Sequence, residues 1–191
     1  MSRASSRITL VVHAETATTT AAAFPVDEPP TERGTSAATA ARDRVPRAGE
    51  LRHAPDRACV ATCAALGLDA LPDPGLRGWD AGRWAGQTLD EVAAEEPDAL
   101  RDWLTRPDAA PHGGESLESL IERVGAWLSA RRAGHTLAIC GPAVARAAVV
   151  HAIGAPASGF WRVDAAPLTG TDLRGGSGRW TVRATGRPLL P

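Results

Sequence analysis

The chain has 191 residues, enough for one core of ordinary size, and we expect residues 1–191 to form a single domain. With 21 basic and 22 acidic side chains its formal net charge is -1, so it offers no basic field for nucleic acid and no polybasic patch for a membrane surface. Both classes of partner are therefore excluded. Three cysteines and an opening apolar run too short for a leader or a membrane span favour a cytoplasmic protein.

The first predicted element is a buried strand over residues 7–12. Its sequence, Arg-Ile-Thr-Leu-Val-Val, is nearly continuous in apolar residues, which is typical of a parallel strand covered on both faces. His13 follows at the carboxyl end, where open α/β sheets bind their ligands. An imidazole there is a candidate site residue, and a histidine that merely closes the strand by a hydrogen bond is an equal alternative.

The next segments predict a loop and two helices. Residues 17–30 are rich in Thr, Ala and Pro and predict a loop across the mouth of the sheet, in which Thr19 is an expected binding residue. Thr31 is a suitable N-cap for a helix over residues 31–42, whereas residues 50–53 are too few to assign. Asp56 is a suitable N-cap for a second helix, over residues 57–66.

The cysteine spacing in the second helix could in principle hold a metal ion. Cys59 and Cys63 lie one helical turn apart, but no second Cys or His pair with matching spacing follows them. Two small apolar packing residues are the better interpretation, and no metal site is predicted.

The second half of the chain predicts more helices and a second buried strand. Residues 67–86 form a glycine-rich loop in which two tryptophans indicate a packed lid. The remaining predicted elements are helices over 88–103, divided at Pro97, and over 115–130, a loop over 107–114, a strand over 135–140, a turn at 141–142, a helix over 143–153, and closing strands over 161–183 with a hairpin at 175–178.

These elements predict an α/β fold, a three-layer sandwich with a mostly parallel central sheet. Each of the two buried apolar strands is followed by a turn and a helix, which is the connection that parallel strands require. We expect the strands at 7–12 and 136–140 to be neighbours, with their carboxyl ends side by side.

Ordered motifs extend this interpretation to a family. Residues 8–16 resemble a strand that ends in Arg-His-Gly-Glu-Thr, residues 54–58 resemble Ser-Pro-x-x-Arg-Ala, and residues 31–34, 82–86, 113–116 and 146–148 continue the match. The chain thus resembles the histidine phosphatase superfamily, whose fold is phosphoglycerate mutase-like. The resemblance implies that a neutral histidine attacks phosphorus, two arginines and a second histidine hold the phosphoryl oxygens, and a carboxylic acid protonates the leaving oxygen.

Position by position, the resemblance implies a degenerate active site. His13 matches the nucleophile and Arg57 the second arginine. Val12 stands where the family has its first arginine, and Ala14 where it has a glycine. Gly78 stands where the family has its acid. Gly141, which Pro142 follows, stands where the family has its second histidine.

Several other residues are candidates for the lost roles. Glu15, Asp80, His53, His112 and Glu115 all fall in segments near the predicted mouth, although a surface or fold-stabilising role is favoured for each of them. Cys140 could form a nucleophilic pair with His13, but strand alternation turns it away if position 141 faces the pocket.

Three functions follow from these residues. The favoured one is a repurposed small-molecule enzyme without a cofactor, in which His13 exchanges a proton with a singly charged, partly apolar ligand that Arg57 holds. The alternatives are a non-catalytic pseudophosphatase that binds a ligand or partner, and a weak phosphomonoesterase that works through a phosphohistidine at His13. A homodimer is a further possibility that the sequence leaves open.

Overall fold

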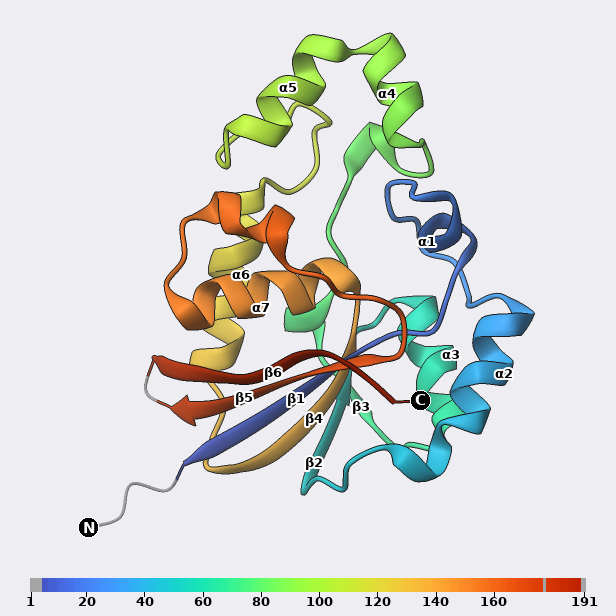
Figure 1. Cartoon of the computed structure of the whole chain (residues 1–191), viewed down its shortest axis with the longest axis vertical. Helices are drawn as coiled ribbons and strands as arrows, with labels where there is room; N and C mark the ends of the chain where they lie inside the picture. Colours follow the sequence, from blue (N-terminus) through green and yellow to red (C-terminus); the bar gives the residue numbers. More distant parts are fainter. Residues whose placement is uncertain (1–4, 177, 190–191) are drawn as a thin grey trace.

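The first strand lies inside the central sheet, with a parallel strand on one side and an antiparallel strand on the other. The computed structural model describes residues 5–176 and 178–189; residues 1–4, 190 and 191 of the expected domain and Ser177 of the predicted hairpin lie outside this description. The six strands are β1 (Ser6–Val12), β2 (Glu50–His53), β3 (Leu71–Pro72), β4 (Gly134–Cys140), β5 (Thr169–Gly176) and β6 (Arg179–Pro188). They lie in the order β3-β2-β4-β1-β5-β6 (Figure 1). β3, β2, β4 and β1 are parallel to one another, β5 is antiparallel to β1, and β6 is antiparallel to β5.

The pairing of β1 with β4 confirms the predicted neighbours. The parallel register brings Val12 opposite Cys140, and the backbone N–H of His13 donates to the Cys140 carbonyl at 3.0 Å. Ile8, Leu10, Leu137 and Ile139 are fully buried, as two-sided coverage requires. The chain therefore leaves the sheet at His13 and at Gly141 side by side.

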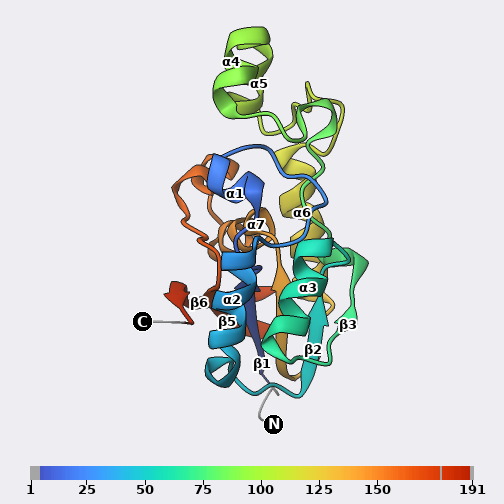
Figure 2. The ribbon, with the colours of Figure 1, turned by 90° about the vertical axis from the view of Figure 1, so that its right-hand side faces the viewer.

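Helices cover both faces of this sheet. The helices are α1 (Ala17–Ala21), α2 (Glu32–Ala40), α3 (Arg57–Leu66), α4 (Leu89–Glu95), α5 (Pro97–Thr105), α6 (Leu117–Ser129) and α7 (Pro142–Ile153), with short 3₁₀ helices at Arg42–Arg44, Pro74–Leu76, Gly82–Trp84 and Ala157–Arg162. α2 and α3 cover one face and α6 and α7 the other (Figures 1 and 2). This arrangement is the predicted three-layer sandwich. Over the described residues, no helix is both long and apolar enough to cross a bilayer.

The sequence interpretation was wrong in two loops. Within the predicted loop at 17–30 the chain forms α1, because Thr16 accepts from the Thr19 backbone and Thr19 reaches back to the Thr16 backbone in a capping box. Within the predicted loop at 67–86, Leu71 and Pro72 form the short strand β3, which pairs with β2. Residues 50–53, too few to assign from the sequence, form β2.

The segment with α4 and α5 projects beyond the sheet and has its own small core (Figure 2). Thr88 and Glu91 form a capping box at the start of α4, and Pro97 separates the two helices as expected. Trp84, Val92 and Trp103 are buried together in this segment with Phe24, Ala81 and Leu100. A second apolar cluster thus stands above the carboxyl ends of the strands.

Candidate functional site

A cavity of about 480 Å³ lies where His13 and Gly141 leave the sheet. This volume is in the range of small-molecule sites. Its walls come from the end of β1, the start of α3, the α1 segment, the loop at 78–79, α5, the start of α7 and residues 160–167. Its lining includes His13, Thr19, Asp56, Ala58, Cys59, Gly78, Trp79, Trp103, Gly141, Pro142, Arg146, Phe160, Trp161 and Asp164.

His13 presents a free ring nitrogen to this cavity. Its side chain is buried, and Nδ1 lies 2.8 Å from the Ala14 carbonyl oxygen. Because a carbonyl only accepts, the N–H of the neutral ring is on Nδ1, and Nε2 carries the free lone pair. Burial lowers the pKa of His13, although the Ala14 carbonyl and the charges of Asp56 and Glu28 act in the opposite direction. The ring is therefore neutral near pH 7 and able to accept a proton.

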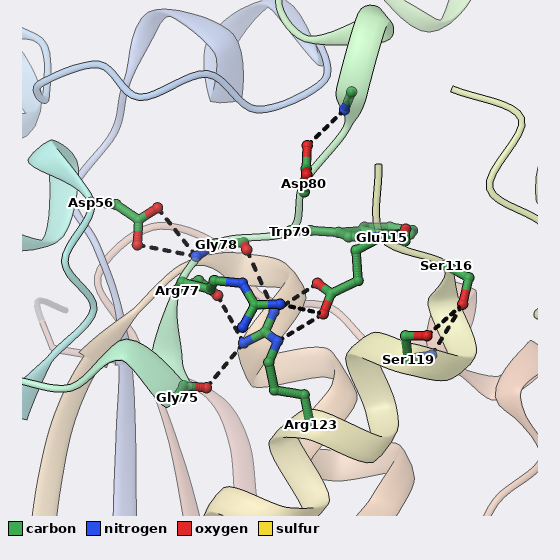
Figure 3. Close-up of polar contacts among 11 residues, drawn as sticks. Asp56, Gly75, Arg77, Gly78, Trp79, Asp80, Glu115, Ser116, Ser119 and Arg123 are labelled. Atoms are coloured by element: carbon green, nitrogen blue, oxygen red, sulfur yellow. Dashed lines mark hydrogen bonds and ion pairs between the residues drawn. The ribbon is translucent and has the colours of Figure 1, made fainter. Parts of the chain in front are cut away.

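Asp56 precedes α3 but does not cap it with its side chain. Both carboxylate oxygens instead accept from the backbone N–H of Gly78, each at 3.1 Å (Figure 3). The backbone N–H of Arg57 is bound by Asp27 Oδ1 at 2.7 Å. The predicted N-cap is thus a cavity residue whose carboxylate lies against the loop at 78.

Arg146 is the cation of the cavity wall. It lies in the second turn of α7, half-buried, with its guanidinium carbon 5.8 Å from the centre of the Phe160 ring. In the part of the chain that the structure describes, no carboxylate lies within ion-pair distance of Arg146, and its buried Nε has no acceptor. A partly desolvated guanidinium without a counter-charge has the capacity to pair with an anion.

Aromatic rings form much of the cavity wall. Trp79 and Trp103 are stacked with ring centres 5.3 Å apart, and Trp161 meets Trp103 edge to face at 4.6 Å. Phe160 lies edge to face against Trp79 at 5.5 Å. Val26, Leu89 and Trp161 also line the cavity and are exposed at its mouth. The cavity therefore has room for an apolar body as well as a charged group.

Some of the predicted site residues do meet here. His13, Thr19, Gly78, Gly141 and Pro142 all line the cavity. They come from four separate segments. The parallel pairing of β1 with β4 explains why His13 lies close to Gly141 and Pro142.

Arg57, predicted to hold the ligand, does not line this cavity. It is exposed at the start of α3 and is not among the lining residues, whereas the next position lines the cavity and is Ala58. Successive side chains on a helix point in directions about 100° apart, so positions 57 and 58 cannot both face the cavity. Matching the motif one residue too early therefore selected a side chain that points away from the site. Among the described residues, the arginine that lines the cavity is Arg146, from a different helix.

Three further predicted residues at the end of β1 lie outside the cavity. Val12 and Ala14 are buried in the main core, and the Ala14 N–H donates to Thr62 Oγ1 at 3.0 Å. Glu15 pairs with Arg33 and accepts from Thr31, which fixes the start of α2.

Asp80, His112 and Glu115 also lie outside this cavity and make contacts within the fold. Asp80 accepts from the Gly82 N–H at 2.9 Å, and His112 Nδ1 accepts from the Gly114 N–H at 3.0 Å. Glu115 is buried and forms two hydrogen bonds of 2.7 Å with Arg123 (Figure 3). Arg123 in turn donates to the carbonyls of residues 75, 77 and 78, so this pair holds the loop that carries Gly78.

The three cysteines are free and buried. Cys140 is fully buried outside the cavity, and burial raises the pKa of its thiol to about 12. Cys59 lines the cavity, but burial raises the pKa of its thiol well above the ordinary value. Among residues 5–176 and 178–189, no three His, Cys, Asp or Glu side chains gather closely enough to hold a metal ion.

The sequence interpretation missed Asp56 and Arg146 as cavity residues. The signal for Arg146 was present, because a lone arginine in an otherwise apolar helix needs a polar destination. Asp56 gave no such signal, since its position before α3 is fully explained by capping. The aromatic wall was also missed, because it joins residues from three distant segments.

Comparison with known families agrees with the fold. A model of the histidine phosphatase superfamily (branch 1) matches residues 8–187 of this chain. The bifunctional protein Rv2228c of Mycobacterium tuberculosis is 38% identical over 65 residues, and an uncharacterized protein of Mycobacterium bovis matches equally. These segments span 34% of this chain and only 18% of the relatives' length.

Solved structures match over nearly the whole chain. A mycobacterial glucosyl-3-phosphoglycerate phosphatase gives a TM-score of 0.79 at 20% identity and covers 96% of this chain and 99% of its own. A phosphoserine phosphatase variant from Entamoeba histolytica, in complex with phosphoserine, gives 0.86 at 13% identity and covers 97% of this chain and 100% of its own. At these identities the likeness establishes the fold alone.

Proposed function

The chain belongs to the histidine phosphatase superfamily, branch 1, and from that premise we propose a function based on the charges that its cavity holds. The cavity binds a singly charged small molecule with an apolar body, and His13 exchanges a proton with that molecule. The protein is on this proposal a repurposed small-molecule enzyme rather than an ordinary phosphatase.

The charge of the cavity argues against a phosphate dianion. Arg146 supplies one positive charge and Asp56 and Asp164 two negative charges, so the described lining carries a net charge of -1 when His13 is neutral. A dianion that entered would lose water without a matching cation and would be repelled by the two carboxylates. A monoanion needs only the one guanidinium.

The unpaired Arg146 is the observation that carries the proposal. Arginines with half-buried side chains are normally paired, as Arg123 is with Glu115 in this chain. A carboxylate matches the fork of a guanidinium and would supply the missing acceptors. On this proposal the ligand's anionic group binds Arg146, and its apolar body lies against Trp79, Trp103 and Trp161.

His13 gives this site its chemistry. Its Nε2 is free and its ring is neutral, so it can accept a proton from a bound ligand and return it. A non-catalytic binding module would use the same cavity without turnover of the ligand.

The test is calorimetry with 3-phenylpropionate, a monoanion with an aromatic body. Arg146→Leu is expected to weaken binding by about tenfold to a hundredfold, because it removes a charged hydrogen-bond donor. Arg57→Ala removes an equal charge outside the cavity and should leave the affinity unchanged. Equal binding to wild type and Arg146→Leu, or an equal loss in Arg57→Ala, would contradict the proposal.

A further inference from the structure

Asp56 is a second charge in the cavity that the protein leaves without a partner. Among the described residues it forms no ion pair, and the backbone N–H of Gly78 is the donor that reaches its carboxylate. A carboxylate has about four lone-pair sites, so its capacity to accept is far from filled. Its negative charge faces the same cavity as the unpaired Arg146.

The other acids near the cavity are differently placed. Glu28 accepts from the backbone N–H and the hydroxyl of Thr18, at 2.8 and 2.6 Å. Asp164 is exposed at the rim. Asp56 is therefore the inner carboxylate that remains open to a ligand, and the neighbouring His13 is neutral and supplies no counter-charge.

Glycine at position 78 makes room for this carboxylate. A Cβ added there would lie 2.9 Å from Asp56 Oδ1, closer than real Cβ contacts (Figure 3). The backbone angle at Gly78 lies outside the left-handed region, so conformation does not require glycine. Because the atom that such a Cβ would meet is the end of a flexible side chain, an alanine at position 78 would displace the Asp56 carboxylate.

We propose that the ligand is a zwitterion with an apolar body, such as an α-amino acid with an aromatic or branched side chain, whose anionic group pairs with Arg146 and whose ammonium group pairs with Asp56. The two protein charges do not pair with each other, so a ligand that bears both signs satisfies both at once. This inference rests on the proposed function and narrows its ligand from a monoanion to a zwitterion.

A series of ligands with one aromatic body tests the pairing. Calorimetry would compare phenylalanine with 3-phenylpropionate, which lacks the ammonium group, and with phenethylamine, which lacks the carboxylate. Phenylalanine is expected to bind about tenfold tighter than either, because it alone meets both charges. Equal or weaker binding of phenylalanine than of 3-phenylpropionate would overturn the zwitterion while leaving the monoanion site intact.

Variants assign the effect to Asp56. Asp56→Asn keeps the shape and removes the charge, so it should abolish the advantage of phenylalanine without weakening 3-phenylpropionate. Gly78→Ala should displace the carboxylate and have the same effect in the wild-type background, but no further effect in Asp56→Asn. An undiminished advantage in Asp56→Asn would overturn the assignment, and failure of all three ligands to bind would overturn the proposed function as well.

Discussion

Purified protein is expected to hydrolyse phenyl phosphate at least about ten-thousandfold more slowly than a histidine phosphatase with its full set of polar groups. The cavity has Ala58, Gly78 and Gly141 where side chains could hold or protonate a phosphoryl group. Loss of one preorganised donor costs about a hundredfold to a thousandfold in rate, and loss of a general acid about a hundredfold or more, although such losses are not additive. A discontinuous assay for released phosphate would measure the residual rate.

Restoring these groups provides the control for that result. The variant with Ala58→Arg, Gly78→Glu and Gly141→His should raise hydrolysis when it also contains Asp56→Leu. The last change is needed because the Asp56 carboxylate occupies the space beside position 78. Vigorous hydrolysis by the wild type, abolished by His13→Ala, would show instead that the unmodified chain is a phosphomonoesterase that works through His13.

Glu115→Gln is expected to lower the free energy of unfolding by about 3 to 5 kcal/mol, because it leaves the buried Arg123 charge without its partner. The side chains of Glu115 and Arg123 are only 8% and 13% exposed, so solvent screens this pair little. Urea denaturation followed by circular dichroism would measure the loss.

An exposed ion pair provides the matched comparison. Asp98 pairs with Arg101 one turn away on α5, where their side chains are 88% and 66% exposed. Asp98→Asn should change the free energy of unfolding by at most about 1 kcal/mol, as is usual for surface pairs. If Glu115→Gln costs no more than Asp98→Asn, the loop at 75–78 is not held by this pair.

The sheet could be predicted because its signal is local and repeated. Two runs of buried aliphatic residues, each followed by a turn and a helix, allow few arrangements, and parallel pairing places His13 beside Gly141. The short strand β3 and the five-residue helix α1 were not predicted, because neither contains enough residues to show a hydrophobic periodicity.

The polar groups of the site were harder to predict than the sheet. Arg57 and Ala58 differ by one position in the sequence, yet only position 58 faces the cavity, and the sequence does not fix where on the helix the cavity lies. Asp56 could cap α3 equally well, and only the approach of the loop at 78 directs it to another donor. Such contacts between distant segments are set by tertiary packing.

The central claim is that the cavity accepts a singly charged group in preference to a phosphate dianion. Calorimetry at pH 8 with phenyl phosphate and 3-phenylpropionate tests it directly, since the two share an aromatic ring and phosphate esters of this kind are dianions above about pH 6. The charges of Asp56, Asp164 and Arg146 predict tighter binding of 3-phenylpropionate to the wild-type protein. Tighter binding of phenyl phosphate would contradict the account.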